Sequence, residues 1–245
     1  MAMRLRINVT TQSTELPWDQ VLRPGRGLVY HLLAEADPDL AGQLHDHGYG
    51  PHGMTPFGYG APVFPHAKRR PGRYAIGGRG YIELGSPLPE LVAHWKQALT
   101  GRTLVDWGGV ALQVRALTAV KPPDMSAGRV EFRTVTPAVL KTLNPMPSPT
   151  RDIRSSYDIL PYESGYLEAL HRNLERKAKT LGLAPDFEIE KITWVGPKRG
   201  FSVQKGRRTG TTLGVALRGS PDLLSAIWSW GLGQANTAGF GWIKA

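Results

Sequence analysis

The chain has 245 residues, and its 30 Lys and Arg against 20 Asp and Glu give a formal net charge of +10. Hydrophobic residues make up 41% of it, too many for a disordered chain, and the absence of cysteine excludes disulfides, thiolate nucleophiles and cysteine-ligated metal sites. The N-terminus lacks the apolar core of a signal peptide, and no run approaches the ~20 apolar residues that cross a bilayer, so we expect a soluble, cytoplasmic protein with no membrane partner. The basic balance favours a polyanionic partner such as nucleic acid or an acidic protein.

The first half of the sequence reads as strand, helix, strands, helix and strand. Met3–Thr10 alternates polar and apolar residues, which predicts a half-buried strand. Gly27–Ala36 is typical of a helix, and Asp37-Pro38 ends it and begins another, with Asp37 as N-cap. The glycines, prolines and histidines of residues 46–72 indicate mostly loop. The elements expected after that loop are strands at 73–76 and 80–84, a helix through Val92, Trp95 and Leu99, and strands at 102–107 and 110–118.

The second half repeats that order. Its expected elements are a strand at 129–135, an irregular Pro- and Ser-rich insert at 142–162, a helix at 163–181, strands at 187–195 and 208–218 around a basic loop, a helix from Ser220-Pro221 through Trp230 and a short strand at 240–244. Two such units predict an α+β protein, a tandem of ferredoxin-like (RRM-like) βαββαβ domains with antiparallel sheets. We place the boundary near Pro122–Ala127, which gives an N-terminal domain of residues 1–122 and a C-terminal domain of residues 123–245.

A glycine-rich motif follows the last predicted helix. It reads Gly231-Leu-Gly-Gln-Ala-Asn-Thr-Ala-Gly-Phe-Gly241 and separates that helix from the last strand. Glycines let a phosphate approach backbone N–H groups closely, so the motif is a candidate anion site. It is not a dinucleotide-binding fingerprint, because that motif follows a strand and opens a helix. A helix C-cap at Gly231 or Gly233 with a tight turn behind it explains the glycines equally well.

Histidines cluster after the second helical segment. His45 lies near a helix end, where an imidazole either performs proton transfers near neutral pH or simply interacts with the helix dipole. His45, His47 and His52 together could also bind zinc or nickel, although no carboxylate-rich cluster accompanies them. Tyr30, on the preceding helix, is either a partner of His45 or a core aromatic.

Two acid-free runs carry much of the positive charge. The first holds Lys198, Arg199, Lys205, Arg207 and Arg208 with Phe201 among them, and the second holds Lys68, Arg69, Arg70, Arg73 and Arg79. Such runs are usually solvated faces. On an RNA-binding protein, however, Arg and Lys meet phosphates and an aromatic stacks on a base. We expect Trp228 and Trp230 to pack in the core instead.

The motifs together resemble a known family. Gly231–Gly241 resembles the C-terminal G-x-G-x5-G-x-G signature of the CRISPR-associated repeat-RNA endoribonucleases, the sixth CRISPR-associated family within the RAMP superfamily. Four further segments resemble the family in order and spacing, and they are Gly27–Tyr30, Ala36–Pro38 with Leu44-His45, Val130–Pro137 and Trp194–Arg199. The resemblance covers nearly the whole chain and implies the same tandem ferredoxin-like fold.

The resemblance also implies a reaction. These enzymes cleave CRISPR repeat RNA without metal or cofactor, by attack of the RNA's own 2′-hydroxyl, and leave a 2′,3′-cyclic phosphate and a 5′-hydroxyl. The matching catalytic positions are His45, as general base or acid, and Tyr30 as its partner. The lysine that often follows the family histidine is missing between Asp46 and Met54. The transition-state cation is therefore expected from His47, from His52 or from an arginine such as Arg26.

The implied partner is CRISPR repeat RNA (pre-crRNA), with other CRISPR effector subunits as additional partners and a monomer or homodimer as the assembly. The residues expected to bind the RNA are Arg26, Lys198, Arg199, Lys205, Arg207, Arg208, Gly231, Gly233, Gln234, Asn236, Gly239 and Gly241. Two other functions fit the sequence. One is a non-cleaving RAMP subunit that only holds guide RNA in an effector complex. The other is a basic protein whose glycine loop binds a nucleotide or phosphate.

Overall fold

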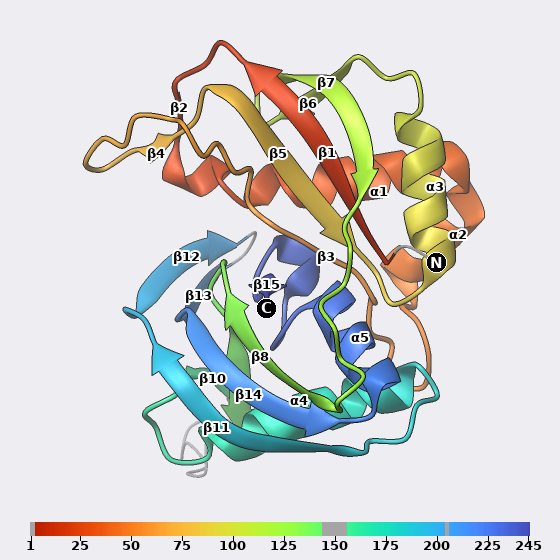
Figure 1. Ribbon diagram of the computed structural model, residues 1–245, viewed down its shortest axis with the longest axis vertical. Helices are drawn as coiled ribbons and strands as arrows, with labels where there is room; N and C mark the ends of the chain where they lie inside the picture. Colours follow the sequence, from red (N-terminus) through yellow and green to blue (C-terminus); the bar gives the residue numbers. More distant parts are fainter. Residues whose placement is uncertain (1–2, 144–155, 204–205) are drawn as a thin grey trace, which may run out of the picture.

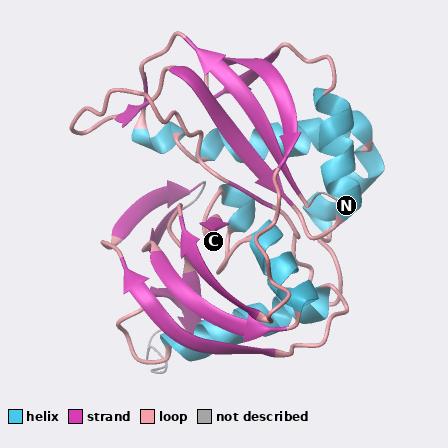
Figure 2. Ribbon diagram, in the orientation of Figure 1, coloured by secondary structure: helices cyan, strands magenta, loops and turns pink. Residues whose placement is uncertain are grey.

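The structure is a computed structural model that describes residues 3–143, 156–203 and 206–245. Two antiparallel sheets, each accompanied by helices, form two units, with the N-terminal one above the C-terminal one in Figure 1. Figure 2 shows that helices also occupy the region between and behind the sheets. None of the helices in the described residues is long and apolar enough to span a bilayer.

The N-terminal unit has ferredoxin-like topology. Its elements are β1 (Arg4–Thr11), β2 (Glu15–Leu16), the 3-10 helix η1 (Trp18–Gln20), α1 (Arg23–Ala36), α2 (Pro38–Asp46), β3 (Gly58–Tyr59), β4 (Tyr74–Ala75), β5 (Gly78–Gly85), α3 (Pro89–Leu99), β6 (Leu104–Trp107) and β7 (Val110–Ala119). Its sheet has the order β3-β5-β1-β7-β6. Without the edge strand β6, the sequence β1-α1-β3-β5-α3-β7 is a βαββαβ unit.

The C-terminal unit repeats that topology. Its elements are β8 (Arg129–Thr134), β9 (Leu140–Leu143), β10 (Ser156–Ile159), α4 (Tyr166–Thr180), β11 (Phe187–Val195), β12 (Arg199–Val203), β13 (Gly206–Gly210), β14 (Leu213–Gly219), α5 (Pro221–Trp230), the 3-10 helix η2 (Asn236–Ala238) and β15 (Ile243–Lys244). The sheet order β11-β14-β8-β15 corresponds to that of the N-terminal unit. The hairpins β9–β10 and β12–β13 are insertions into this plan. The predicted tandem ferredoxin-like fold is therefore confirmed.

Local sequence explains the elements that frame the site. Leu5, Ile7 and Val9 of β1 are buried and alternate with less buried residues, as a strand with one packed face requires. The Asp37 carboxylate accepts a hydrogen bond of 2.9 Å from the backbone N–H of Leu40, so the predicted N-cap of α2 is present. Because Asp37 is extended, α2 turns back against α1 instead of continuing it.

The two units share an apolar interface. Each unit has its own hydrophobic core, and Val139 and Phe240 from the C-terminal unit belong to the core cluster of the N-terminal one. Trp228 and Trp230 are both buried, as predicted. Residues 120–128 connect the two sheets. We propose to divide the chain within that connection, into residues 1–122 and 123–245.

Several predicted element bounds were wrong. Residues 46–72 are mostly loop, as predicted, and their one strand, β3, is only two residues long and gives no detectable periodicity. The helix predicted from Gly27 begins at Arg23, because Pro24 is tolerated in the first turn of a helix. The single strand predicted over residues 208–218 is two, β13 and β14. Of the predicted strand at 240–244, only β15 is paired, while most of the predicted insert at 142–162 lies outside the described residues.

Candidate functional site

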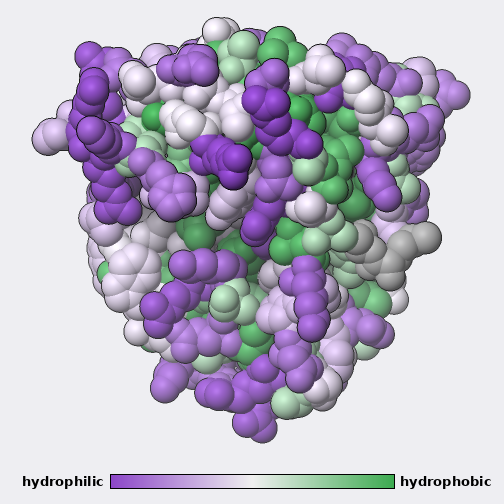
Figure 3. All heavy atoms as spheres, turned by 45° about the horizontal axis from the view of Figure 1, so that its top comes forward, coloured by the Kyte–Doolittle hydropathy of each residue, from purple (hydrophilic) through white to green (hydrophobic). Residues whose placement is uncertain are grey.

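A cleft of about 1710 Å³ lies between the two units. One wall is formed by η1, α1 and α2, and the other by the segment after β8, the β12–β13 hairpin and the loop after α5. Figure 3 shows a face on which hydrophilic residues predominate, with apolar residues visible between them. Among the described residues, six cationic side chains and one carboxylate line the cleft, and they are Arg23, Arg26, Lys141, Arg199, Arg207 and Arg208 against Asp19. The cleft is therefore suited to a polyanion.

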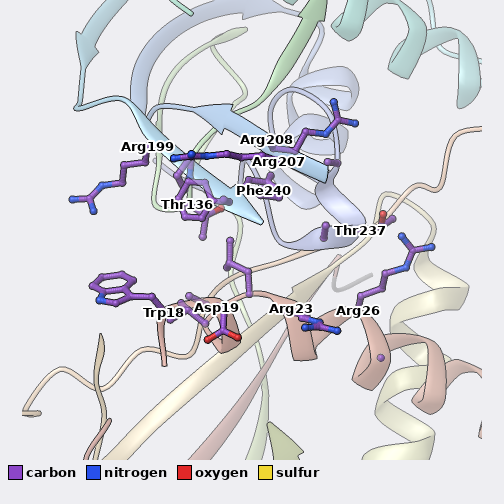
Figure 4. A pocket seen from close by; sticks show the side chains of 18 of the residues that line it. Trp18, Asp19, Arg23, Arg26, Thr136, Arg199, Arg207, Arg208, Thr237 and Phe240 are labelled. Atoms are coloured by element: carbon purple, nitrogen blue, oxygen red, sulfur yellow. The ribbon is translucent and has the colours of Figure 1, made fainter. Parts of the chain in front are cut away.

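One face of α1 forms the length of the first wall. Arg23, Arg26 and Tyr30 line the cleft and are three and seven residues apart, a spacing that places them on the same side of a helix. The Arg26 guanidinium carbon lies 5.5 Å from the centroid of the Tyr30 ring. Figure 4 shows Arg23 and Arg26 on this wall, opposite residues of the C-terminal unit.

Tyr30 and His45 meet where α1 and α2 pack together. Their rings form an edge-to-face contact with centroids 5.5 Å apart, and Phe57 packs on Tyr30 in the same manner at 5.3 Å. Burial raises the pKa of the Tyr30 hydroxyl, while a hydrogen bond with Thr55 and the charge of Arg26 oppose that rise to a smaller degree. The Tyr30 hydroxyl is therefore a neutral donor at physiological pH, and Tyr30 both packs and faces the cleft.

His45 is exposed and lines the cleft. Its Nδ1 lies 3.0 Å from an Asp46 carboxylate oxygen. A carboxylate can only accept a hydrogen bond, so Nδ1 carries the single proton of the neutral ring. Nε2 then keeps an unprotonated lone pair. The imidazole can thus present a basic nitrogen to a molecule in the cleft.

The other two histidines lie elsewhere. His47 is the exposed C-cap of α2 and does not line the cleft. The pKa of the Glu175 carboxyl on α4 is lowered mainly by Lys179 and in smaller part by His52, which puts His52 near α4. Within the described residues, no group of three His, Cys, Asp or Glu side chains is placed to hold a metal ion. His45, His47 and His52 do not converge, whereas Arg26 lies beside Tyr30.

The basic hairpin contributes to the opposite wall. Arg199 and Arg207 are exposed and line the cleft, and Figure 4 shows them across the gap from α1. Arg208 is half-buried and its Nη1 lies 3.2 Å from an Asp158 carboxylate oxygen, so part of its charge is already neutralised. Lys198 is exposed outside the cleft lining, and Lys205 lies outside the described residues.

The glycine loop is largely buried. Gly241 has a φ of +66°, and a Cβ there would lie 1.8 Å from the Leu232 carbonyl oxygen. Gly233 is similarly confined, since its Cβ would lie 2.6 Å from the Val139 carbonyl oxygen. Two amide hydrogen bonds tie the Asn236 side chain to the Leu232 and Phe240 carbonyls. The glycines are therefore required by tight backbone packing.

None of the loop residues predicted to bind RNA lines the cleft, and those residues are Gly231, Gly233, Gln234, Asn236, Gly239 and Gly241. Their neighbours Ala235, Thr237, Ala238 and Phe240 do line it. The Phe240 ring packs edge-to-face on Phe201 of the basic hairpin, with centroids 5.4 Å apart. The loop thus shapes the second wall of the cleft.

Sequence reasoning missed several residues of the site. Arg23 could have been found, because it lies on the same helical face as Tyr30, but the predicted helix began too late to include it. Lys141 and Trp18 carry no local signal, and only the tertiary structure brings them to the cleft. Lys177 of α4 is fully buried and donates to the Gly231 carbonyl, a contact that a helical lysine in a charged sequence does not suggest.

The C-terminal unit matches the model of a known protein family. Residues 120–245, more than half of the chain, match the family model described as CRISPR associated protein Cas6, C-terminal. The CRISPR-associated endoribonuclease Cas6 1 of Methanocaldococcus jannaschii is 24% identical over 99% of this chain and 92% of its own length. The CRISPR-associated endoribonuclease Cas6 of Pyrococcus furiosus is 24% identical over 89% of this chain and 80% of its own.

Solved structures share the fold. A protein described as an RAMP protein binding different RNA substrates has a TM-score of 0.81 at 16% identity, with 99% of this chain and 98% of that chain covered. A CRISPR associated protein Cas6 has a TM-score of 0.75 at 22% identity, with 100% and 99% covered. The family model, the relatives and the fold agree, and the chain therefore belongs to the Cas6 family of CRISPR-associated proteins.

Proposed function

We propose that this protein is a metal-independent endoribonuclease that cleaves CRISPR repeat RNA and releases guide RNAs. The observation that carries the proposal is the contact between Tyr30 and His45, with centroids 5.5 Å apart, on the wall of a cleft lined by six cations and one carboxylate. Two curated relatives named as endoribonucleases support it. A cleft of this charge is suited to an RNA backbone, and the two rings supply the chemistry.

The proposed reaction is a transesterification within the RNA, in which phosphorus exchanges its bond to the 5′-oxygen for a bond to the 2′-oxygen. The 2′-hydroxyl loses its proton and its oxygen attacks the adjacent phosphorus, while the bond to the 5′-oxygen breaks and that oxygen gains a proton. The products are a 2′,3′-cyclic phosphate and a 5′-hydroxyl. Between them lies a phosphorane with extra negative charge, which fixed donors and cations stabilise.

Each task has a residue of suitable chemistry. We assign the general base to His45, because the carboxylate of Asp46 engages Nδ1 and leaves Nε2 to accept the 2′-proton. We assign the transition-state cation to Arg26, which lies beside the Tyr30 ring and lines the cleft. We assign the general acid to Tyr30, whose hydroxyl is kept protonated by burial and gives its proton to the leaving 5′-oxygen.

The RNA-binding surface extends from this centre across the cleft. Arg199 and Arg207 of the hairpin meet the RNA backbone from the side opposite α1. The glycine loop positions the RNA indirectly, because its buried glycines set the course of the segment that contains Thr237 and Phe240.

Incubation with the CRISPR repeat RNA of the source organism in EDTA tests the proposal. We expect cleavage at one position, with a 2′,3′-cyclic phosphate on the upstream product, and no cleavage when the ribose 5′ of the cut is replaced by deoxyribose. Tight binding without cleavage indicates the non-cleaving RAMP subunit, and neither binding nor cleavage indicates a small anionic ligand instead. Cleavage of the deoxyribose substrate contradicts the 2′-hydroxyl mechanism.

A further inference from the structure

Trp18 is an exposed aromatic residue at the cleft. The chain has seven tryptophans, and five of them are buried, with less than 4% of their surface exposed. Trp18, in η1, is 50% exposed and lines the cleft, whereas Trp194, on β11, is 48% exposed and lies outside the cleft lining. An indole of this size usually contributes to a core, so its exposure on a ligand-facing wall requires an explanation.

The Trp18 ring is held in a fixed orientation. Its Nε1 donates a hydrogen bond of 2.9 Å to the Gly72 carbonyl oxygen. Its ring makes an edge-to-face contact with Tyr74, with centroids 5.5 Å apart and planes at 80°. The Tyr74 hydroxyl in turn donates to the Pro62 carbonyl at 2.7 Å. The exposed ring is therefore pre-ordered, so little conformational entropy is lost when a ligand packs on it.

Arginines line both walls of the cleft that contains this ring. Figure 4 shows Trp18 and Arg199 on opposite walls at the same end of the cleft, with Arg23, at the start of α1, farther from that end. The loop that contains the hydrogen-bond acceptor of Trp18 also carries the exposed Arg69 and Arg70. An ordered aromatic ring among guanidinium groups is the combination that binds single-stranded nucleic acid, because the ring accepts a base while the cations meet phosphates.

We propose that Trp18 is a stacking platform for an unpaired nucleobase of the RNA. The inference rests on the proposed RNA cleavage and adds a specific subsite to it. The helical face that leads from Arg23 to Tyr30 is roughly 10 Å long at ~1.5 Å per residue. The stacked base therefore lies a few nucleotides from the scissile phosphate, and Trp18 fixes the position at which the RNA enters the centre.

The test measures the affinity of repeat RNAs for Trp18→Leu, which keeps an apolar side chain against Tyr74 but cannot stack on a base. Trp194→Leu is the matched control, because Trp194 has the same exposure outside the cleft. The RNAs are the CRISPR repeat with a 2′-deoxyribose at the cut, which prevents cleavage, and a series of such RNAs with one abasic residue each. We expect Trp18→Leu to bind the complete RNA roughly 5- to 150-fold more weakly, and Trp18→Phe to recover most of that loss.

One abasic RNA is expected to identify the stacked base. On that RNA the difference between wild type and Trp18→Leu disappears, while on the others it persists. Unchanged affinity of Trp18→Leu for the complete RNA, or an equal loss on every abasic RNA, would overturn the stacking platform. Cleavage by the wild-type protein is measured in parallel, so that failure of the proposed function is seen separately as a wild-type protein that does not cut the repeat.

Discussion

The Nζ of Lys177 lies 2.8 Å from the Oδ1 of Asn236, and this contact ties α4 to the glycine loop. The same Nζ donates to the Gly231 carbonyl at 2.5 Å and lies 4.7 Å from the centroid of the Trp230 ring. Asn236 in turn donates to two carbonyls of the loop. A single buried amino group therefore holds the start and the middle of the loop that shapes the second wall of the cleft.

Replacing Lys177 by Met is expected to destabilise the protein by about 1–3 kcal/mol, because Asn236 Oδ1 and the Gly231 carbonyl lose a buried donor. The contribution of Lys177 to stability also depends on pH. Burial lowers the Lys177 pKa of the folded protein well below 10.5, its value in the unfolded chain. Between these two pKa values the unfolded chain binds more protons than the folded one, so stability rises with pH up to about 10.5. Urea unfolding at a series of pH values should show that the free energy of unfolding of the wild type rises relative to that of Lys177→Met as the pH rises. Lys179→Met, exposed on the same helix, is the control, and a pH-independent gap between wild type and Lys177→Met refutes the linkage.

Replacing His45 by Ala is expected to slow single-turnover cleavage by about 10²–10⁴-fold, because a positioned general base contributes that much. Its affinity for the uncleavable RNA should change little. His47→Ala is the control, since His47 is also exposed and lies two residues farther on, outside the cleft lining. Equal losses of rate and affinity in His45→Ala mean that His45 only binds or folds. A repeat RNA with a 5′-sulfur leaving atom needs no general acid, so recovery of His45→Ala on that RNA contradicts the assignment as base.

The fold could be predicted because its elements follow simple periodicities. The alternation of β1, the break at Asp37-Pro38 and the full length of β11 were all visible in the sequence. β3 could not be predicted, since its two residues, Gly58 and Tyr59, have no pattern of their own and pair only because β5 offers an edge. The sequence thus predicted the tandem fold from the long elements alone.

The site was predictable only in part. Tyr30 and His45 were proposed as partners across the helix pair, and the extended Asp37 does bring them into contact. The choice among His47, His52 and Arg26 as cation could not be made, because it depends on how the loop after α2 turns toward α4. The glycine motif was visible, but whether its glycines face a ligand or the interior depends on contacts with Val139 and Tyr59, which are far away in the sequence.

Replacing Arg26 by Ala is expected to lower kcat about 100-fold or more, because a fixed donor to the phosphorane is lost. Arg26→Lys should recover only part of the rate, since an ammonium lacks the planar fork of guanidinium. Arg23→Ala is the matched control on the same face of α1. It should raise KM and leave kcat nearly unchanged. If Arg26→Ala and Arg23→Ala change kcat and KM in the same proportions, Arg26 has no special role in the transition state.

Two arginines of the basic hairpin should differ in the salt dependence of RNA binding. Removal of a cation that meets a single-stranded phosphate reduces the slope of log K against log salt concentration by about 0.7. We expect that reduction for Arg207→Ala, because Arg207 is exposed at the cleft. Arg208→Ala should reduce the slope less, because Arg208 is already paired with Asp158. Titrations of uncleavable repeat RNA at several salt concentrations measure both slopes, and equal slopes mean that the Asp158 pair opens on binding.

The two units are joined by Arg4, and its removal should uncouple them. The guanidinium carbon of Arg4, on β1, lies 4.2 Å and 3.7 Å from the ring centroids of Trp228 and Trp242 in the C-terminal unit. The group also donates to the Ile243 carbonyl at 2.8 Å and to the Trp228 carbonyl, and it lies 3.8 Å from Glu83. Burial lowers the pKa of Arg4 to about 9, with Glu83 opposing, so the group is still charged at pH 7.

Arg4→Met is therefore expected to cost about 3–5 kcal/mol, because it breaks a buried ionic network and leaves two carbonyls without donors. Urea unfolding should change from one transition to two as the units unfold separately. Arg6→Met is the matched control: Arg6 lies on the same strand and pairs with the same Glu83 at 2.6 Å, but within the N-terminal unit and partly exposed. If both variants lose the same stability and keep a single transition, the link between the units is the apolar interface and not Arg4.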